Sequence, residues 1–261
     1  MKFKTYLSIF AVLAMVMVVS IIAVNAQDKA AVDPAPKPTI VLVHGAFADA
    51  SGWGHVITRL EKAGYNVIAV QNALNSYADD VTTTRRVVDA QKGAVVLVGH
   101  SYGGAVITGA SVGASNIKAL VYIAAFAPDS GEVIGPLLEK YPTPLGAALR
   151  PDAAGYLYID RALFKDAFAA DVPDEERNIM AATQKPINST IFGTMFGIPG
   201  WKSFPTWYIV GTQDNAINPE MQRMFAKRMN AKTTEVASSH VPFISQPDAV
   251  VKVIEEAATA K

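Results

Sequence analysis

One stretch of the sequence carries the pattern of a reactive serine. Residues 94–104 read Ala-Val-Val-Leu-Val-Gly-His-Ser-Tyr-Gly-Gly, so Ser101 lies in the pattern G-x-S-x-G. An apolar strand is expected before the serine and a helix of small residues after it, which is the context of a nucleophile elbow. The turn is so sharp that only glycine or a very small residue fits at Gly99 and Gly103. Ser101 is therefore the candidate nucleophile for acyl transfer, and a structural serine in a glycine-rich turn is the alternative.

A serine hydroxyl is a weak nucleophile and needs a base, usually a histidine that a third group orients. The sequence has four histidines. His55 lies off the apolar stripe of its expected helix, and we interpret His44 as structural. His100 is next to Ser101 in the elbow, and its side chain is expected to point away. His240 follows the last expected strand and returns to the edge that carries Ser101, so we predict it as the base; a surface histidine is the alternative.

The orienting acid is expected after another strand at the same edge of the sheet. Asp214 ends the segment Trp-Tyr-Ile-Val-Gly-Thr-Gln-Asp, and 26 residues separate it from His240. Nucleophile, acid and histidine then follow one another in the chain order of an α/β-hydrolase. Asp129 is a rival, and an Asx turn beside Asn215 is the structural alternative for Asp214.

Acyl transfer also needs amide donors for the oxyanion. One is expected from the backbone N–H of Tyr102, directly after the nucleophile. The second is expected from the loop after the first strand, where we choose Ala46 and keep Phe47 as the alternative. Two such donors contribute roughly 3–4 kcal/mol each to the transition state in a dry site.

The elements that must position these residues alternate between short apolar runs and amphipathic segments. This alternation is typical of a parallel sheet covered by helices, and continuous apolar runs predict burial on both faces. Helices are expected from a Ser51 cap, from Asn218 and from Pro247. The expected strands are Thr39–Val43, Asn66–Gln71, Ala94–Val98, Lys118–Ala124, Thr206–Val210 and Lys232–Val236.

The alternation breaks between about residues 128 and 204, where Pro and Gly are frequent. Only Arg161–Ala169 and Glu175–Thr183 have clear helical patterns there. The segment is interpreted as an inserted cap after the fourth strand, and as a candidate lid over the site. Its aromatic side chains either line a pocket or fill the cap: Tyr156, Phe164, Phe192, Phe196 and Trp201.

The N-terminus predicts export. Residues 1–26 combine a basic start with an almost unbroken apolar stretch that ends at Val-Asn-Ala, as in a signal peptide. A retained membrane anchor is the alternative, because about 20 apolar residues span a bilayer. Residues 27–37 are expected to be a linker and 38–261 the folded domain, so we expect a periplasmic or secreted protein.

Composition excludes several classes of function. Of the 261 residues, 23 are Lys or Arg and 23 are Asp or Glu, which gives no electrostatic reason to expect nucleic acid. Zero cysteines exclude a disulfide framework and a thiolate nucleophile. No metal cluster, phosphate loop or dinucleotide fingerprint is present in the sequence, so no cofactor is inferred.

The sequence resembles the α/β-hydrolase superfamily, in the branch of plant methylesterases, hydroxynitrile lyases and small bacterial esterases. The resemblance covers about residues 38–258 and rests on His44-Gly45-Ala46, Gly52-Trp53, Gly99-His100-Ser101-Tyr102-Gly103, Gln213-Asp214 and Ser239-His240. It implies a six-stranded, largely parallel sheet with a cap after the fourth strand. It also implies Ser101 as nucleophile, Asp214 as acid, His240 as base, and Ala46 and Tyr102 as oxyanion donors.

Two departures bear on the reaction that the resemblance implies. Lyases of this branch carry a threonine where this chain has Gly45, and a lysine where it has Val241. Both departures favour hydrolysis of a small hydrophobic ester or lactone by a serine esterase. A lyase or C–C hydrolase and a non-catalytic ligand-binding module are the alternatives. The sequence does not determine the oligomeric state.

Overall fold

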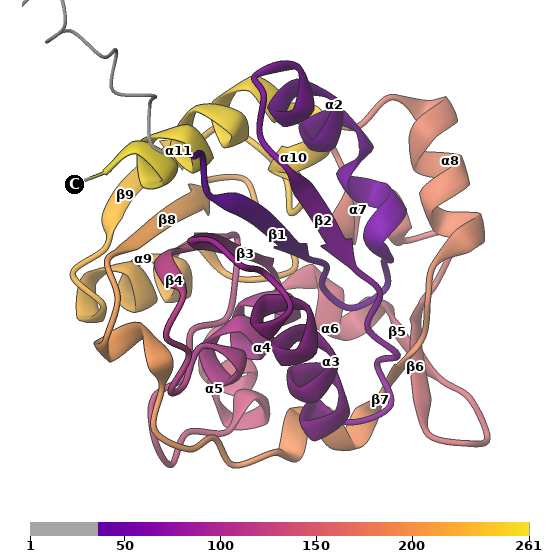
Figure 1. Cartoon of the computed structure of the whole chain (residues 1–261). Helices are drawn as coiled ribbons and strands as arrows, with labels where there is room; N and C mark the ends of the chain where they lie inside the picture. Colours follow the sequence, from indigo (N-terminus) through magenta and orange to yellow (C-terminus); the bar gives the residue numbers. More distant parts are fainter. Residues whose placement is uncertain (1–35, 261) are drawn as a thin grey trace, which may run out of the picture. The chain divides into compact units, whose positions relative to one another are not determined.

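The structure is a computed structural model that describes residues 36–260 (Figure 1). The expected signal peptide, residues 1–26, lies outside the described residues, as does most of the expected linker. Six parallel strands form the central sheet in the order β2-β1-β3-β4-β8-β9. Their bounds are β1 (Thr39–Val43), β2 (Val67–Val70), β3 (Val95–His100), β4 (Ile117–Ile123), β8 (Thr206–Gly211) and β9 (Lys232–Val236).

The residues of the inner strands of this sheet are almost all buried, whereas most residues of the two edge strands are partly or fully exposed. Every residue of β3 and β8 is buried, as continuous apolar runs predict. The expectation of burial on both faces is wrong for β9, which reads Lys-Thr-Thr-Glu-Val and has no buried residue. It is also wrong for most of β2. Both strands form an edge of the sheet, where one flank has no neighbouring strand.

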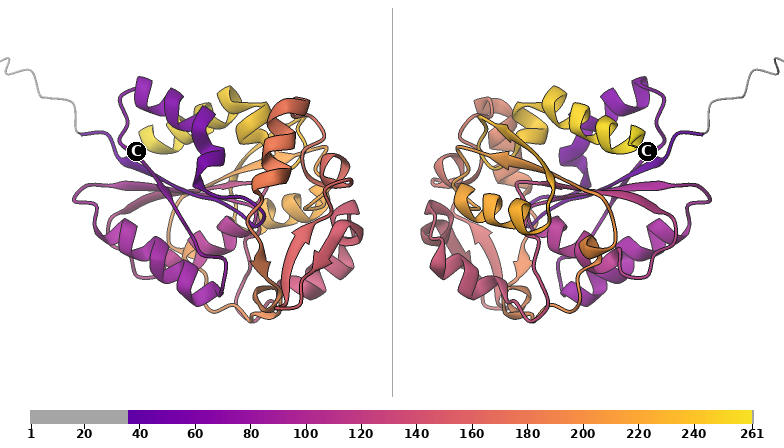
Figure 2. Two further views of the ribbon diagram at one scale, coloured as in Figure 1. Left: turned by 90° about the vertical axis from the view of Figure 1, so that its right-hand side faces the viewer. Right: turned by 90° about the vertical axis from the view of Figure 1, so that its left-hand side faces the viewer.

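Helices cover both faces of the sheet (Figure 2). On one face lie α2 and α11, which pack against each other, and on the other face lie α3, α4 and α9. A short helix, α10, follows the last strand. The bounds are α2 (Gly54–Lys62), α3 (Tyr77–Asp89), α4 (Tyr102–Ala110), α9 (Pro219–Arg228), α10 (Pro242–Ser245) and α11 (Pro247–Thr259).

Two details of the helices differ from the sequence predictions. Ser51 does not cap α2: a 3-10 helix over Ala50–Trp53 comes first, and Asp49 caps it by accepting a hydrogen bond from the Ser51 N–H. Helix α3 was not predicted at all. Its buried side chains include the polar Asp80 and Thr84, so it lacks the apolar stripe that periodicity detects.

The segment between β4 and β8 forms the cap and lies at one end of the strands (Figure 2). The helices expected near 161–169 and 175–183 are present as α7 and α8, although α7 is shorter than predicted. The sequence missed two helices and a three-stranded antiparallel sheet in the order β5-β6-β7. The bounds are α5 (Ile134–Lys140), α6 (Pro144–Ala148), β5 (Leu149–Pro151), β6 (Tyr156–Ile159), α7 (Phe164–Phe168), α8 (Asp174–Thr183) and β7 (Ile187–Asn188).

Candidate active site

The turn between β3 and α4 holds Ser101 in a strained backbone conformation. Its φ and ψ angles are 53° and −124°, in a region that residues with a side chain rarely adopt. A Cβ atom at Gly99 would lie 2.5 Å from the Gly103 carbonyl oxygen, and one at Gly103 would lie 2.5 Å from the Val43 carbonyl oxygen. The two glycines are therefore required by the close approach of three backbone segments, which is the reason predicted from the sequence.

His240 and Asp214 meet at the carboxyl ends of β9 and β8. These strands are hydrogen-bonded neighbours, and Gly211 pairs with Val236, so the loops that follow them start side by side. The His240 Nδ1 atom lies 2.7 Å from the Asp214 Oδ2 atom. Both side chains are almost fully buried, with 1% and 0% exposed. A buried carboxylate at this distance orients the imidazole and leaves its Nε2 atom for proton transfer.

Both oxygens of the Asp214 carboxylate accept hydrogen bonds. Its Oδ1 atom accepts hydrogen bonds from the N–H groups of Ala216 and Ile217, at 2.7 and 2.9 Å. The bond to Ala216 closes an Asx turn, the structural role that was the alternative for Asp214. Asp214 therefore both forms this turn and contacts His240. The Oδ2 atom also accepts a bond of 2.7 Å from the Gln222 side chain.

Gln222 was not predicted as a site residue. It lies on α9, is completely buried, and its Oε1 atom accepts a bond of 3.0 Å from the Gly211 N–H. Its amide also donates to the Ile217 carbonyl at 2.7 Å. The only signal in the sequence is a polar residue beside Met221 on the apolar face of its helix. Gln222 ties the end of β8 to the carboxylate that contacts His240.

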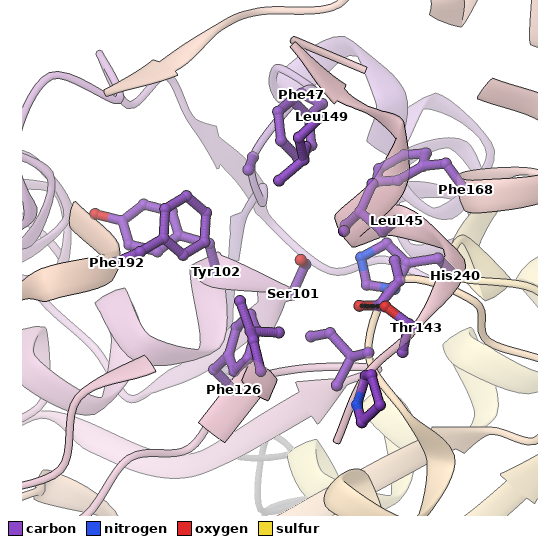
Figure 3. A pocket seen from close by; sticks show the side chains of 16 residues that line it. Phe47, Ser101, Tyr102, Phe126, Thr143, Leu145, Leu149, Phe168, Phe192 and His240 are labelled. Carbon is purple, nitrogen blue, oxygen red and sulfur yellow. Dashed lines mark hydrogen bonds between the residues drawn. The ribbon is translucent and has the colours of Figure 1, made fainter. Parts of the chain in front are cut away.

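Ser101 and His240 line the same cavity, and the Ser101 hydroxyl points into it (Figure 3). Within residues 36–260, the Ser101 hydroxyl forms no hydrogen bond with the His240 imidazole. Such bonds are often long in enzymes without substrate and tighten when substrate binds. The structure thus brings the predicted nucleophile, base and acid to one edge of the sheet, with a direct bond between the last two.

The other three histidines have separate roles in the fold. The His100 Nε2 donates to the His240 carbonyl oxygen at 2.8 Å, and the two rings lie 4.6 Å apart. Burial lowers the pKa of His100 well below its usual value, so this ring is neutral. The His44 Nε2 accepts from the Asn72 N–H at 3.1 Å, and burial lowers the pKa of His44 to about 4. His55 is exposed and contacts Glu176 on the cap.

The rival acid has a different partner. The Asp129 carboxylate accepts a hydrogen bond of 2.6 Å from the Lys202 ammonium group. In the described part of the chain it forms no hydrogen bond with His240. Asp129 therefore joins two segments of the cap, while Asp214 is the carboxylate bonded to the imidazole.

The expected oxyanion donors also border the cavity. Ala46, Phe47 and Tyr102 all line it beside Ser101. Among the residues that the structure describes, their backbone N–H groups donate no hydrogen bond, so they are free for a ligand oxygen. The chain turns at Phe47, where φ is 61°. Both Ala46 and Phe47 therefore remain candidates for the second donor.

The cavity has a volume of about 140 Å³ and its wall comes mostly from apolar side chains of the cap and the sheet edge. Of the aromatic cap residues that the sequence singled out, Phe192 lines it, whereas Phe164, Phe196 and Trp201 are buried outside it. Phe168, which was not singled out, also lines it. The Tyr156 hydroxyl instead donates to Asn75 at 3.0 Å. Over residues 36–260 no group of three or more potential metal ligands occurs. Over the same residues, no helix has both the length and the apolar character that a membrane span requires.

The fold and the arrangement of these side chains define a hydrolase of the α/β class. The profile of the Alpha/beta hydrolase family matches residues 40–253, and the chain belongs to that family. The predicted fold class is thereby confirmed, with its six-stranded parallel sheet and its cap after the fourth strand of that sheet.

Relatives from fungi and plants match most of the chain. The alpha/beta hydrolase nvfD of Aspergillus novofumigatus is 28% identical, over 85% of this chain and 97% of its own length. Methylesterase 8 of Arabidopsis thaliana is 27% identical, over 81% of this chain and 86% of its own length. The alpha-hydroxynitrile lyase of the same plant is 25% identical, over 85% of this chain and 98% of its own length. These relatives confirm the branch that the sequence resembles.

Solved structures show the same fold. A pyrethroid hydrolase from Sphingobium faniae JZ-2 superposes with a TM-score of 0.74 at 21% identity, over 85% of this chain and 98% of that one. Together, the family and the named relatives support hydrolysis, and ester hydrolysis in general, as the reaction class of this chain.

Proposed function

We propose that this protein is a serine esterase that works through an acyl-enzyme on Ser101. The Ser101 hydroxyl attacks the ester carbonyl while His240 takes its proton, and Asp214 stabilises the imidazolium. His240 then gives that proton to the leaving alcohol, and a water molecule frees the acyl group by the same steps. The N–H groups of Tyr102 and of Ala46 or Phe47 bind the oxyanion.

One observation carries this proposal: the 2.7 Å bond between His240 and Asp214 beside a cavity into which the strained Ser101 turn projects its hydroxyl. A buried histidine–carboxylate pair gives a serine hydroxyl the base that it lacks. The cap shields the site from water, which strengthens each charge interaction there.

The lining of the cavity indicates an uncharged substrate. Its sixteen residues, all within the described range, include neither a carboxylate nor a Lys or Arg side chain. The volume of about 140 Å³ is close to the roughly 150 Å³ apolar cavities that hold benzene. A small hydrophobic ester or lactone fits this space, consistent with the apolar side chains of Leu138, Leu145 and Phe192.

Two positions argue against the lyase alternative. A Cβ atom at Gly45 would lie only 2.6 Å from the Ser101 Cβ and 3.1 Å from its Oγ, so a lyase-like threonine needs a shifted backbone. The residue after His240 is the buried Val241, which supplies no cation to stabilise a departing cyanide. The site therefore suits the release of an alcohol or phenol from an ester better than the release of cyanide.

The test is hydrolysis of p-nitrophenyl acetate by the purified protein and by Ser101→Ala. We expect the variant to lose activity by about a thousandfold or more, as removal of a nucleophile does, and a fluorophosphonate probe to label Ser101 only in the unchanged protein. Full activity of Ser101→Ala would contradict the mechanism. Release of cyanide from mandelonitrile faster than ester turnover would favour the lyase, and failure of the probe to label would favour a binding module.

We also propose that the protein is exported, on the basis of the N-terminal sequence alone. The apolar stretch of residues 1–26 resembles a signal peptide that ends at Ala26. Expression of the full chain followed by cell fractionation and N-terminal sequencing tests this. We expect a mature N-terminus at Gln27; an intact N-terminus in the membrane fraction would instead indicate the anchor.

A further inference from the structure

A second cavity lies behind the aromatic wall of the site. Phe47 and Phe168 line the cavity that holds Ser101, and they also line a neighbouring cavity of about 60 Å³. Their rings meet edge to face with centroids 6.2 Å apart, at the border of the Ser101 cavity (Figure 3). The two side chains thus form a thin partition between two spaces.

The second cavity continues outward into a third, of about 360 Å³, between α2 and α8. These two cavities share five lining residues, namely Ser51, Gly52, Met180, Thr183 and Ile244. We call the two together the side chamber. Ile179, 58% exposed, lines its outer part together with the His55 and Glu176 pair. The side chamber therefore leads from the surface, between the sheet domain and the cap, to the partition.

The inner part of the side chamber is apolar. Phe168, Val241 and Phe243 form much of its wall, and all three are buried. Among the described residues that line it, Asp49 is the one charged group, and its carboxylate already accepts two hydrogen bonds from Ser51. Such a wall disfavours an anion, and its apolar side chains suit an alkyl or aryl group.

Phe168 of the partition packs against His240, the side chain proposed to protonate the leaving alcohol. The Phe168 ring lies 4.9 Å from the His240 ring, and Val241 follows that histidine. In the proposed reaction His240 protonates the leaving oxygen, so that oxygen must lie within hydrogen-bond reach of the imidazole. An alcohol group longer than the Ser101 cavity meets Phe168 first.

We propose that the side chamber is a second substrate subsite, which receives the uncharged, apolar alcohol arm of an ester when the Phe47 and Phe168 side chains part. This inference rests on the proposed esterase function. It names the substrate class as neutral esters with a short acyl group and an extended apolar alcohol. The acyl group stays in the Ser101 cavity, and the alcohol arm runs along the partition toward α8.

The experiment reduces the free space of the side chamber by enlarging a side chain of α8. Met180→Trp adds bulk where Met180 lines both parts of the chamber, and Met180→Leu is the volume-matched control. Two substrate series are compared, alkyl acetates of increasing alcohol length and methyl esters of increasing acyl length. Thr183→Trp, at an exposed position on the same rim, is the second variant if Met180→Trp does not fold by circular dichroism.

We expect Met180→Trp to lower the ratio of kcat/KM for long over short alcohols by about tenfold or more, the scale on which a blocked apolar pocket discriminates. Met180→Leu and the acyl series should show no such change in ratio. An equal effect on long and short alcohols, or an effect on the acyl series instead, would overturn the subsite. Absence of any hydrolysis that depends on Ser101 would overturn the esterase proposal as well, so the two failures are distinguishable.

Discussion

Asp171 of the cap accepts two hydrogen bonds from Ser239, the residue directly before His240. The Asp171 Oδ2 atom accepts a hydrogen bond of 3.1 Å from the Ser239 N–H, and its Oδ1 atom accepts a second bond from the Ser239 hydroxyl. Asp171 lies between α7 and α8, so this pair joins the cap to the loop that carries the base. The cap therefore helps to position the imidazole as well as to cover the cavity.

Asp171→Ala is expected to lower kcat more than it raises KM. Loss of both hydrogen bonds leaves the Ser239 loop free to shift, and a small displacement of a base reduces the rate steeply. We expect a decrease of about tenfold, because a hydrogen bond to a charged group contributes about 1.5–3 kcal/mol and this one is partly exposed. Steady-state kinetics over a pH range measure the effect.

Asp174→Ala is the matched control, since Asp174 is an exposed cap carboxylate paired with Arg177. It should keep the kcat of the unchanged protein. Ser239→Ala combined with Asp171→Ala should be no worse than Asp171→Ala alone, because both remove parts of one interaction. Fully additive losses would contradict the link.

Gln222→Met is expected to destabilise the protein and to slow catalysis. Methionine matches the length of glutamine but cannot donate to Asp214 or accept from the Gly211 N–H. Each buried polar group left without a partner costs about 1–3 kcal/mol. We expect a lower midpoint of urea unfolding and a kcat reduced by about tenfold or more, since Asp214 then holds His240 less firmly. Unchanged kcat would show that Asp214 needs no support from α9.

The buried His44 predicts a loss of stability in mild acid. Burial lowers the folded-state pKa of His44 from its usual value of 6.5 to about 4, so the unfolded chain binds the proton more tightly. Above pH 6.5 both states are neutral and His44 has no effect on the pH dependence. As pH falls from 6.5 toward 4, protonation favours unfolding, by up to about 1.4 kcal/mol per pH unit.

Urea unfolding at a series of pH values, for the unchanged protein and for His44→Asn, measures this effect. His44→Asn should flatten the slope between pH 6.5 and 4 without removing it, because the buried His100 acts in the same direction. Parallel slopes in the two proteins would contradict the assignment. An NMR titration in which the His44 imidazole protonates above pH 6 would do the same.

Ser101→Gly is expected to be more stable than Ser101→Ala. Both variants lack the hydroxyl, but only alanine keeps the Cβ atom in a conformation that costs about 1–3 kcal/mol. Glycine loses more chain entropy on folding, by about 0.5–1 kcal/mol, so the net difference should be about 1 kcal/mol. Thermal unfolding of the two inactive proteins tests this. If Ser101→Gly were less stable than Ser101→Ala by about 0.5–1 kcal/mol, the entropy difference alone, the elbow would not be strained by its side chain.

Much of the site could be predicted from the sequence because its parts are local. The elbow depends on glycines within two residues of Ser101, and their steric effect is the same wherever the turn occurs. The buried strands are short apolar runs, and the carboxyl ends of parallel strands gather at one edge. These rules predict that Ser101, Asp214 and His240 lie near one another, and the structure places them at one edge.

Only the tertiary structure decided which side chains support that site. Gln222 contacts Asp214 from α9, Asp171 reaches Ser239 from the cap, and α3 buries Asp80, whose carboxylate accepts a bond of 2.9 Å from the Tyr102 hydroxyl. A polar residue on a helix has no pattern that tells burial from exposure, because its partner lies far away in the chain. Such contacts depend on how whole elements pack, and no short-range rule of sequence encodes that packing.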